Sequence, residues 1–194
     1  KSVVRIEAEA VANLEKSINK DFIKAVDTIY AAKGRVVLTG MGKSGLVARK
    51  IVATLNSTGT AAIYLHPTDA LHGDLGMVRK EDVVIIISKS GSTDEISKLF
   101  PMFKRLGVKL IAMSGNPDSV LVKDSDIFLN ISVKEEACPH DLAPTSSTTA
   151  TVVMGDALSV ALLQKRGFTA EDFALLHPGG SLGKRLSLKI DEIM

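Results

Sequence analysis

Apolar residues near the start of the chain recur at steps of three and four, with charged residues between them. This spacing is typical of amphipathic helices, and it predicts one or two helices within residues 3–30. Five short apolar runs follow, most of them rich in β-branched residues, which favours strands. The predicted strands are residues 35–39, 61–65, 82–88, 108–113 and 126–133.

These runs are continuous rather than alternating, so both faces of the sheet must be covered. Helical patterns at residues 46–56, 94–105 and 145–166 fall between or after the strands, and Gly167 follows the last of them. A repeated strand–helix order favours a parallel sheet with helices on each side, an α/β fold.

Composition narrows the class of protein. The chain has 194 residues and 45% apolar content, which suits one ordered domain. No apolar run approaches the roughly 20 residues of a membrane span, and the charged N-terminus lacks a signal segment, so we expect a soluble intracellular protein. The single cysteine, Cys138, excludes an internal disulfide and is expected to be a small buried hydrophobe.

Charge gives no sign of a nucleic-acid partner. Lys and Arg number 24 against 22 Asp and Glu, and the two signs are interspersed. Eight aromatic residues without Trp offer little surface for stacking bases. Binding of a small anionic ligand needs only a few local donors, so the overall charge does not exclude it.

Two loops follow strand ends where ligands of parallel sheets bind. "GMGKSG" (residues 40–45) has the wrong spacing for a Rossmann or P-loop motif, but it offers backbone amides, Lys43 and Ser44 to an anion. "SKSGST" (residues 88–93) adds Ser88, Ser90 and Thr93 just before a helix. The alternatives are a plain turn for the first loop and a helix N-cap for the second.

Other candidate groups lie in predicted loops. His66 and His72 suit hydrogen bonds to sugar hydroxyls, and their spacing is not a recognised metal pattern. Glu135 or Glu136 follows the last strand, and either could be a general base if a pocket raised its pKa. His177 lies in a glycine-rich turn near the C-terminus.

Six segments together resemble the sugar isomerase (SIS) domain, specifically the D-arabinose 5-phosphate isomerase family. They are "GMGKSG", "STGT", "HGDLGM", "SKSGSTDEI", "KEEACPHDLAPTSSTTATVVMGDALSVALL" and "RGFTAEDFALLHPGGSLGKRL", which extend over nearly the whole chain. The resemblance implies one SIS domain over residues 1–194, with a helical segment at about 1–31 and a five-stranded parallel sheet in an α/β/α sandwich. It also implies interconversion of D-ribulose 5-phosphate and D-arabinose 5-phosphate without a cofactor, in the supply of 3-deoxy-D-manno-octulosonate (Kdo) for lipopolysaccharide or capsule.

Site residues are carried over from this resemblance. The catalytic set is Lys43, Glu95, Glu136, His177 and His72; the substrate-binding set is Ser44, Gly59, Thr60, His66, Ser88, Ser90 and Thr93. No metal is required, although His66 and His72 could trap an inhibitory divalent ion. Two departures from the family pattern, Lys89 and Ser92, have no assigned role, and the chain stops near where many members continue into paired CBS domains.

The resemblance further implies a cytoplasmic homo-oligomer, with a tetramer favoured, that binds neither nucleic acid nor membrane. Three alternatives stay open. The chain could be a non-catalytic sensor of sugar phosphates, an isomerase for another substrate such as a hexulose 6-phosphate, or a nucleotide binder. Which subunit would supply His177 is also open.

Overall fold

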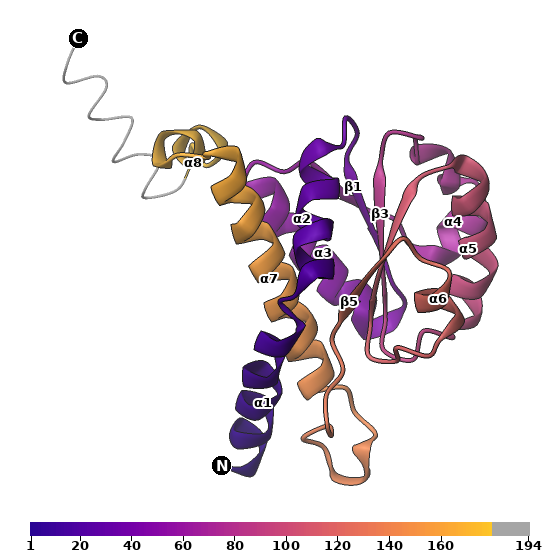
Figure 1. Cartoon of the computed structure of the whole chain (residues 1–194), viewed down its shortest axis with the longest axis vertical. Helices are drawn as coiled ribbons and strands as arrows, with labels where there is room; N and C mark the ends of the chain where they lie inside the picture. The colour runs from indigo at the N-terminus through magenta and orange to yellow at the C-terminus, as the bar shows by residue number, and fades with distance from the viewer. Residues whose placement is uncertain (180–194) are drawn as a thin grey trace.

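The computed structural model describes residues 1–179, which form a parallel sheet with helices on both faces (Figure 1). The strand order is β2-β1-β3-β4-β5, and every neighbouring pair is parallel. The predicted α/β sandwich with five parallel strands is therefore confirmed. The strands are β1 (Val36–Thr39), β2 (Ala62–Tyr64), β3 (Val83–Ser88), β4 (Lys109–Ser114) and β5 (Ile127–Asn130).

Helices and 3-10 turns occupy most of the remaining chain. The α-helices are α1 (Ser2–Asn13), α2 (Lys20–Ala31), α3 (Gly42–Ser57), α4 (Pro67–Leu71), α5 (Asp94–Leu106), α6 (Val120–Lys123), α7 (Ser146–Arg166) and α8 (Ala170–Leu176). The 3-10 turns are η1 (Leu14–Ser17), η2 (Asp74–Met77) and η3 (Pro139–Asp141).

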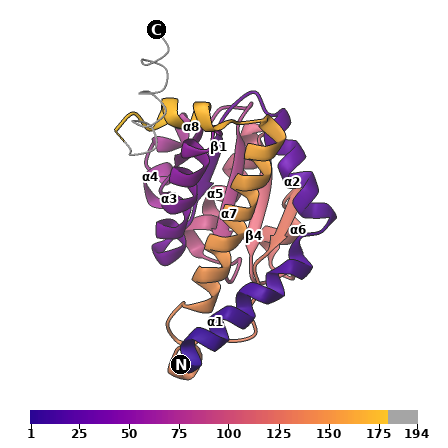
Figure 2. The same cartoon turned by 90° about the vertical axis from the view of Figure 1, so that its left-hand side faces the viewer.

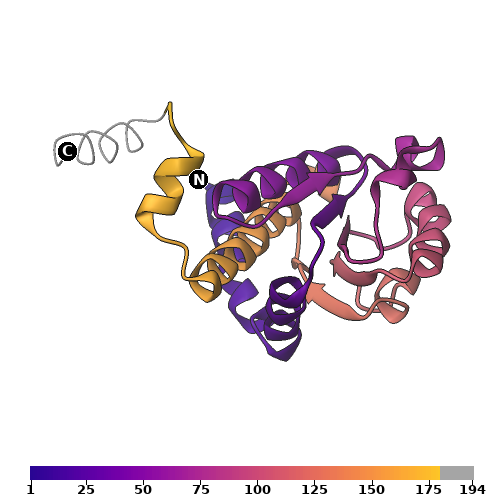
Figure 3. The ribbon, with the colours of Figure 1, turned by 90° about the horizontal axis from the view of Figure 1, so that it is seen from above.

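Two hydrophobic cores hold the layers together, one on each face of the sheet. In Figure 3, α2, α3 and α7 lie on one face, and α5 lies on the other with α4 and α6. All six residues of β3 are buried because the strand is central and covered on both faces. This arrangement explains its unbroken apolar run.

Two predicted boundaries were wrong. The first loop is shorter than "GMGKSG", because α3 already begins at Gly42. The last strand ends at Asn130 rather than residue 133. The N–H of Ile131 still bonds to the carbonyl of Ser114, but the N–H of Ser132 instead donates to the side-chain Oδ1 of Asn130 at 2.9 Å, in a local turn.

Two further expectations need correction. Cys138 is only partly buried, because it lies in the loop between β5 and α7. The 21-residue α7 is long and apolar enough to span a membrane by length and composition, contrary to our expectation. Half of its apolar window is buried within the protein, as is usual for the core helix of a packed domain.

The long α7 sets the axis of the molecule. In Figure 2 it runs from the end of the protein where the N-terminus lies to the end that carries α8. Its first turn lies beside the carboxyl edge of the sheet, and its last turn lies beside the amino edge. Residues at its two ends therefore cannot meet within one chain.

Candidate functional site

The carboxyl ends of three neighbouring strands lie in register. Ser88 at the end of β3 pairs with Ser114 of β4, and Ser114 pairs with Asn130 of β5. The loops after β3 and β5 therefore start at the same edge of the sheet, with the end of β4 between them. Sheets of this kind bind ligands at this edge, where helix N-termini also point.

The loop after β3 concentrates hydroxyl groups at the start of the 13-residue α5. Ser88 Oγ lies 3.1 Å from Thr93 Oγ1 and accepts from the backbone N–H of Gly91 at 3.1 Å, while Ser90 Oγ accepts from the N–H of Ser92 at 3.3 Å. Thr93 occupies the N-cap position, yet within residues 1–179 its side chain makes no capping bond. The N-cap alternative therefore does not explain the hydroxyl of Thr93.

Gly91 is required by the shape of this loop. Its φ is +67°, a left-handed conformation that favours glycine. A Cβ at this position would overlap the side chain of Ser119 and lie 3.3 Å from Ser114 Oγ. The loop therefore folds tightly against the end of β4, which fixes the positions of its neighbours Ser90 and Ser92.

Glu136 lies in the loop after β5 and is almost fully buried, with a 3% exposed fraction. Its carboxylate accepts from the backbone N–H groups of Thr145 and Ser147, at 2.8 and 3.1 Å, and from Thr145 Oγ1 at 3.2 Å. Ser147 Oγ and Lys89 Nζ, the latter at 2.7 Å, complete the set. Five donors thus hold one carboxylate at the start of α7.

These donors decide the charge of Glu136. Burial alone would raise its pKa, but the bonds from Lys89, from the Ser147 hydroxyl and from the backbone N–H groups of Thr145 and Ser147 outweigh burial and lower the pKa to about 2. The expectation of a raised pKa was wrong for this arrangement. Glu136 is a firmly ionised, precisely held carboxylate.

Lys89 points into the site rather than outward. Its Nζ pairs with Glu136, while its side chain keeps 48% exposure. Its backbone carbonyl accepts from the N–H of Gly115 at 3.1 Å. A Cβ added to Gly115 would lie 3.6 Å from Lys89 Cγ, so the lysine side chain packs closely over this glycine. The end of β4 therefore helps to direct this side chain, whose role the sequence left open.

A cavity of about 210 Å³ lies at this edge. Lys43 and Ser44 from the first turns of α3 line it together with Lys89 and Ser147. Its lining is mixed: Met41, Val47 and Ile131 are apolar, while Lys43 and Lys89 supply the positive charge that suits a small anion. Two of the residues predicted for the site, Lys43 and Ser44, therefore meet the Lys89–Glu136 pair here.

The other residues predicted for this edge lie outside the lining of the cavity: Ser88, Ser90, Thr93, Glu136, Glu95, His66 and His72. Glu95 is half-buried in the first turn of α5. His66 follows β2, and its Nδ1 is buried 3.9 Å from Asp69 Oδ2. His72 is exposed just after α4. Within residues 1–179, no three His, Cys, Asp or Glu side chains converge as a metal site would require.

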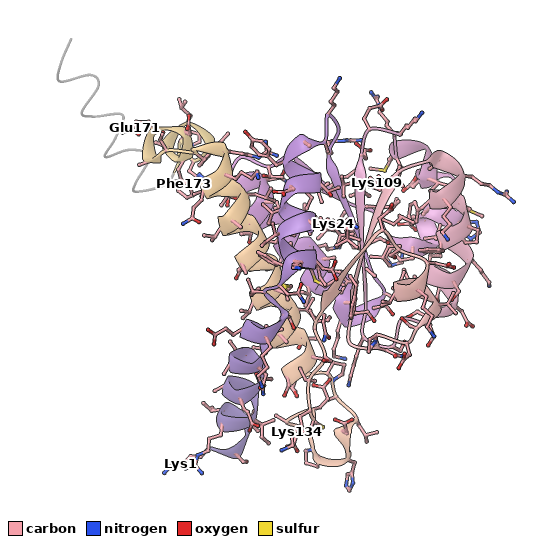
Figure 4. The ribbon with its side chains drawn as sticks, viewed as in Figure 1. Lys1, Lys24, Lys109, Lys134, Glu171 and Phe173 are labelled. Atoms are coloured by element: carbon pink, nitrogen blue, oxygen red, sulfur yellow. The ribbon has the colours of Figure 1, made fainter. Side chains whose placement is uncertain are left out.

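Gly59, Thr60 and His177 lie at the opposite end of the molecule. Thr60 Oγ1 accepts from Arg166 Nε at 3.0 Å, at the far end of α7. His177 Nδ1 lies 2.7 Å from the carbonyl oxygen of Phe173, and the rings of these two residues stack. Figure 4 shows Phe173 at the α8 end and Lys134, two residues before Glu136, at the other.

The separation can be worked out from helix geometry. Ser147, which contacts Glu136, and Arg166, which contacts Thr60, both belong to α7. At a rise of 1.5 Å per residue they lie about 29 Å apart. A single chain therefore does not bring His177, Gly59 or Thr60 to the cavity.

Sequence reasoning missed two members of the site. Thr145 and Ser147 belong to the Ser/Thr cluster that opens α7, and neither is among the site residues predicted from the sequence. The available signal was the position of this cluster after a buried strand and a pair of glutamates. Hydroxyl groups and free N–H groups at a helix N-terminus attract a carboxylate.

Comparison with known proteins agrees with this arrangement. The model of the SIS domain family matches residues 28–161, which include all five strands and most of α7. The chain belongs to the SIS domain family. The resemblance drawn from the sequence is thus confirmed at the level of the domain.

Individual relatives of this SIS domain are more specific. The arabinose 5-phosphate isomerase KdsD of Pseudomonas aeruginosa is 57% identical over 98% of this chain, and KdsD of Escherichia coli K12 is 55% identical over all of it. The chain spans 59% of the length of each of these relatives.

A solved structure is also similar. Protein c3406 of Escherichia coli CFT073, solved in complex with arabinose 5-phosphate, has 42% identity and a TM-score of 0.88, with 91% of this chain and 94% of that chain covered.

Proposed function

We propose that this SIS domain is an aldose–ketose isomerase that interconverts D-ribulose 5-phosphate and D-arabinose 5-phosphate. The main support for this proposal is the buried Glu136 carboxylate, which is held at the carboxyl edge of the sheet beside a cationic cavity and a hydroxyl-rich loop. The KdsD relatives and the arabinose 5-phosphate complex of a similar protein support the choice of sugar.

The proposed reaction passes through an enediolate. Glu136 removes a proton from C1 of the ketose, and the electron pair of the C1–H bond becomes the C1=C2 double bond while negative charge moves to the C2 oxygen. Lys43 stabilises that charge. A proton then moves from O1 to O2, and C2 is protonated to give the aldose. Glu95 is the second candidate for the base.

The remaining groups bind and orient the sugar. Ser88, Ser90 and Thr93, with Ser44, would hold the 5-phosphate through hydroxyl groups and the first N–H groups of α5. Binding energy from this remote phosphate would align C1 and C2 with Glu136. His66 and His72 are proposed to meet the sugar hydroxyls, and His177 or His72 is proposed to move protons between O1 and O2.

The distant residues require a second chain. If His177, Gly59 and Thr60 act on substrate, they act at the cavity of a neighbouring subunit, since α7 separates them from their own. This supports a homo-oligomer, for which a tetramer is our proposal. We further propose a cytoplasmic enzyme whose product supplies Kdo synthesis.

Solvent exchange tests the base. The chain is incubated with ribulose 5-phosphate in heavy water, and deuterium entering the sugar is measured for the wild type, Glu136→Gln and Glu135→Gln. We expect exchange to fall at least a hundredfold in Glu136→Gln, as removal of a general base typically costs that much. Glu135, the adjacent exposed glutamate, is the matched control and should change exchange less than twofold.

Two results would contradict the proposal. Normal deuterium entry in Glu136→Gln would transfer the role of base to another group, with Glu95→Gln as the next variant. Binding of ribulose 5-phosphate without any turnover by the wild type would favour the sugar-phosphate sensor. Faster turnover of a hexulose 6-phosphate would favour an isomerase for the longer sugar.

A further inference from the structure

The ion pair between Lys89 and Glu136 joins the two parts of the proposed site. Lys89 lies between Ser88 and Ser90, in the loop that we assign to the phosphate. Its Nζ nevertheless reaches across to Glu136 Oε1 at 2.7 Å, on the loop after β5. One cation is therefore within the range of both the base and the expected position of the anion.

Glu136 does not depend on Lys89 for its position. Thr145 and Ser147 supply four further donors, two backbone N–H groups and two hydroxyls, all from the start of α7. Asp141 Oδ1 also accepts from the backbone N–H of Glu136 at 2.6 Å. If Lys89 turned away, the carboxylate would stay in place and lose only the charge that faces it.

Lys89 has the freedom that Glu136 lacks. Its side chain is about half exposed and lines the cavity with Lys43, whereas the Glu136 side chain is 1% exposed. A lysine ammonium is a compact charge on a flexible stem, with three donors that can point to different partners. Between Lys89 and Glu136, it is Lys89 that can change partner.

We propose that Lys89 exchanges partners on substrate binding, moving from Glu136 to the 5-phosphate of the sugar held by residues 88–93. The phosphate dianion replaces the carboxylate as the partner of Nζ, and Glu136 is released to act on C1. This inference rests on the proposed function. It assigns Lys89 as a substrate-binding residue that also controls the base.

The exchange has a chemical consequence. While Lys89 faces Glu136, the carboxylate is too well stabilised to attract a proton strongly. Loss of the ammonium makes the same carboxylate more basic at the moment when C1 lies beside it. A base that is weak before binding and stronger in the complex suits a proton abstraction that should occur only on bound sugar.

A double-mutant cycle tests the exchange. If the proposal is right, the Glu136 carboxylate and the 5-phosphate of the ligand compete for Lys89, so the effects of changing Lys89 and Glu136 are coupled. The probe is D-arabinitol 5-phosphate, a polyol without the carbonyl group, which binds but cannot be isomerised. Its dissociation constant is measured by calorimetry at pH 7.5 for the wild type, Lys89→Met, Glu136→Gln and the double variant, each checked for folding by circular dichroism.

Competition predicts opposite signs for the two single variants. Lys89→Met should weaken binding ten- to a hundredfold, since a charge-assisted bond to phosphate is lost. Glu136→Gln should tighten binding about tenfold, because Lys89 is no longer held by a carboxylate. In the double variant, affinity should match Lys89→Met within about twofold.

Controls separate this role from a structural one. Lys89→Arg keeps the charge and should restore most of the affinity lost in Lys89→Met. Lys109→Met removes a lysine that pairs with Asp126 at 2.9 Å near the opposite edge (Figure 4), and should leave the affinity unchanged. If Lys89 only held the site together by pairing with Glu136, Glu136→Gln would weaken binding of the probe, as Lys89→Met does.

The outcomes are distinguishable. Unchanged affinity in Lys89→Met, or unchanged or weaker binding in Glu136→Gln, overturns the exchange. Absence of ribulose 5-phosphate turnover in the wild type instead counts against the proposed function. If the wild type turns over ribulose 5-phosphate normally and the effects of Lys89→Met and Glu136→Gln simply add in the double variant, the exchange is rejected while the proposed function stands.

Discussion

Replacement of Glu136 by glutamine should destabilise the protein in a manner that depends on pH. The pKa of Glu136 is about 2, against an ordinary value of 4.5. At 1.36 kcal/mol per pKa unit, this difference corresponds to about 3.4 kcal/mol of folding stability at pH 7. Glutamine resembles the protonated glutamate, so Glu136→Gln should lose about 3 kcal/mol.

The direction of the pH effect follows from proton binding. Below pH 4.5 the unfolded chain takes up a proton at this residue while the folded chain still resists it. Stability from Glu136 is therefore complete above pH 4.5 and is lost as the pH falls toward about 2. At pH 3.5 the remaining contribution is about 2 kcal/mol.

Urea unfolding at pH 7 and pH 3.5 measures this change. The wild type, Glu136→Gln and the exposed neighbour control Glu135→Gln are compared at one protein concentration, because association would otherwise shift the midpoint. We expect the gap between the wild type and Glu136→Gln to narrow from about 3 to about 2 kcal/mol. Glu135→Gln should follow the wild type within about 0.5 kcal/mol at both pH values.

A gap of equal size at both pH values would refute the reasoning. It would mean that the donors around Glu136 stabilise the side chain equally well in its charged and neutral forms. The loss in Glu136→Gln would then come from packing. A low pKa of Glu136 would then be excluded.

Three further substitutions probe the loop, the opposite edge and the core. Gly91→Ala should cost about 2–3 kcal/mol in urea unfolding and raise the Michaelis constant, because its Cβ would overlap Ser119. Gly107→Ala has a similar φ of +70° but would meet only Lys80 Cε, at 4.0 Å, so it should cost only about 1 kcal/mol; equal costs would contradict the overlap. Asp82→Asn should lower stability by about 1–3 kcal/mol, since the Asp82 carboxylate accepts from two backbone N–H groups. The Michaelis constant should not change, because Asp82 lies far from the site; a changed constant would contradict this separation. Phe103→Ala should cost about 3–5 kcal/mol, because the ring is fully buried, and a thermal shift corresponding to under about 1 kcal/mol would contradict its packing.

The architecture could be predicted from sequence because its signals are local. An unbroken apolar run such as residues 83–88 is explained by a central strand covered on both faces. Repeated strand–helix order then leaves few topologies. Element ends were harder to predict. At the end of β5, the Asn130 side chain accepts from the N–H of Ser132, a local bond that no hydrophobic periodicity records.

The site could be predicted only as far as topology carries it. Parallel strands bring Ser88 and the loop before Glu136 to one edge, so their convergence follows from the fold class. The direction of a side chain does not. Lys89 follows a buried strand in an exposed position, and only the structure shows that its ammonium turns inward to Glu136 while the pKa of that carboxylate falls.

The placement of His177 shows where resemblance and geometry give different information. A shared motif can identify a residue without saying which chain it serves. Thr60 lies near the α8 end with Arg166, while the cavity lies about 29 Å away along α7. If His177 and Thr60 act on substrate, both must do so at a neighbouring subunit, and they would arrive there together because α7 and α8 carry them as one end of the molecule. Assembly and catalysis would then be inseparable, and a variant that dissociates the oligomer should lose the proton transfers of His177 while its own Glu136 and phosphate loop stay intact.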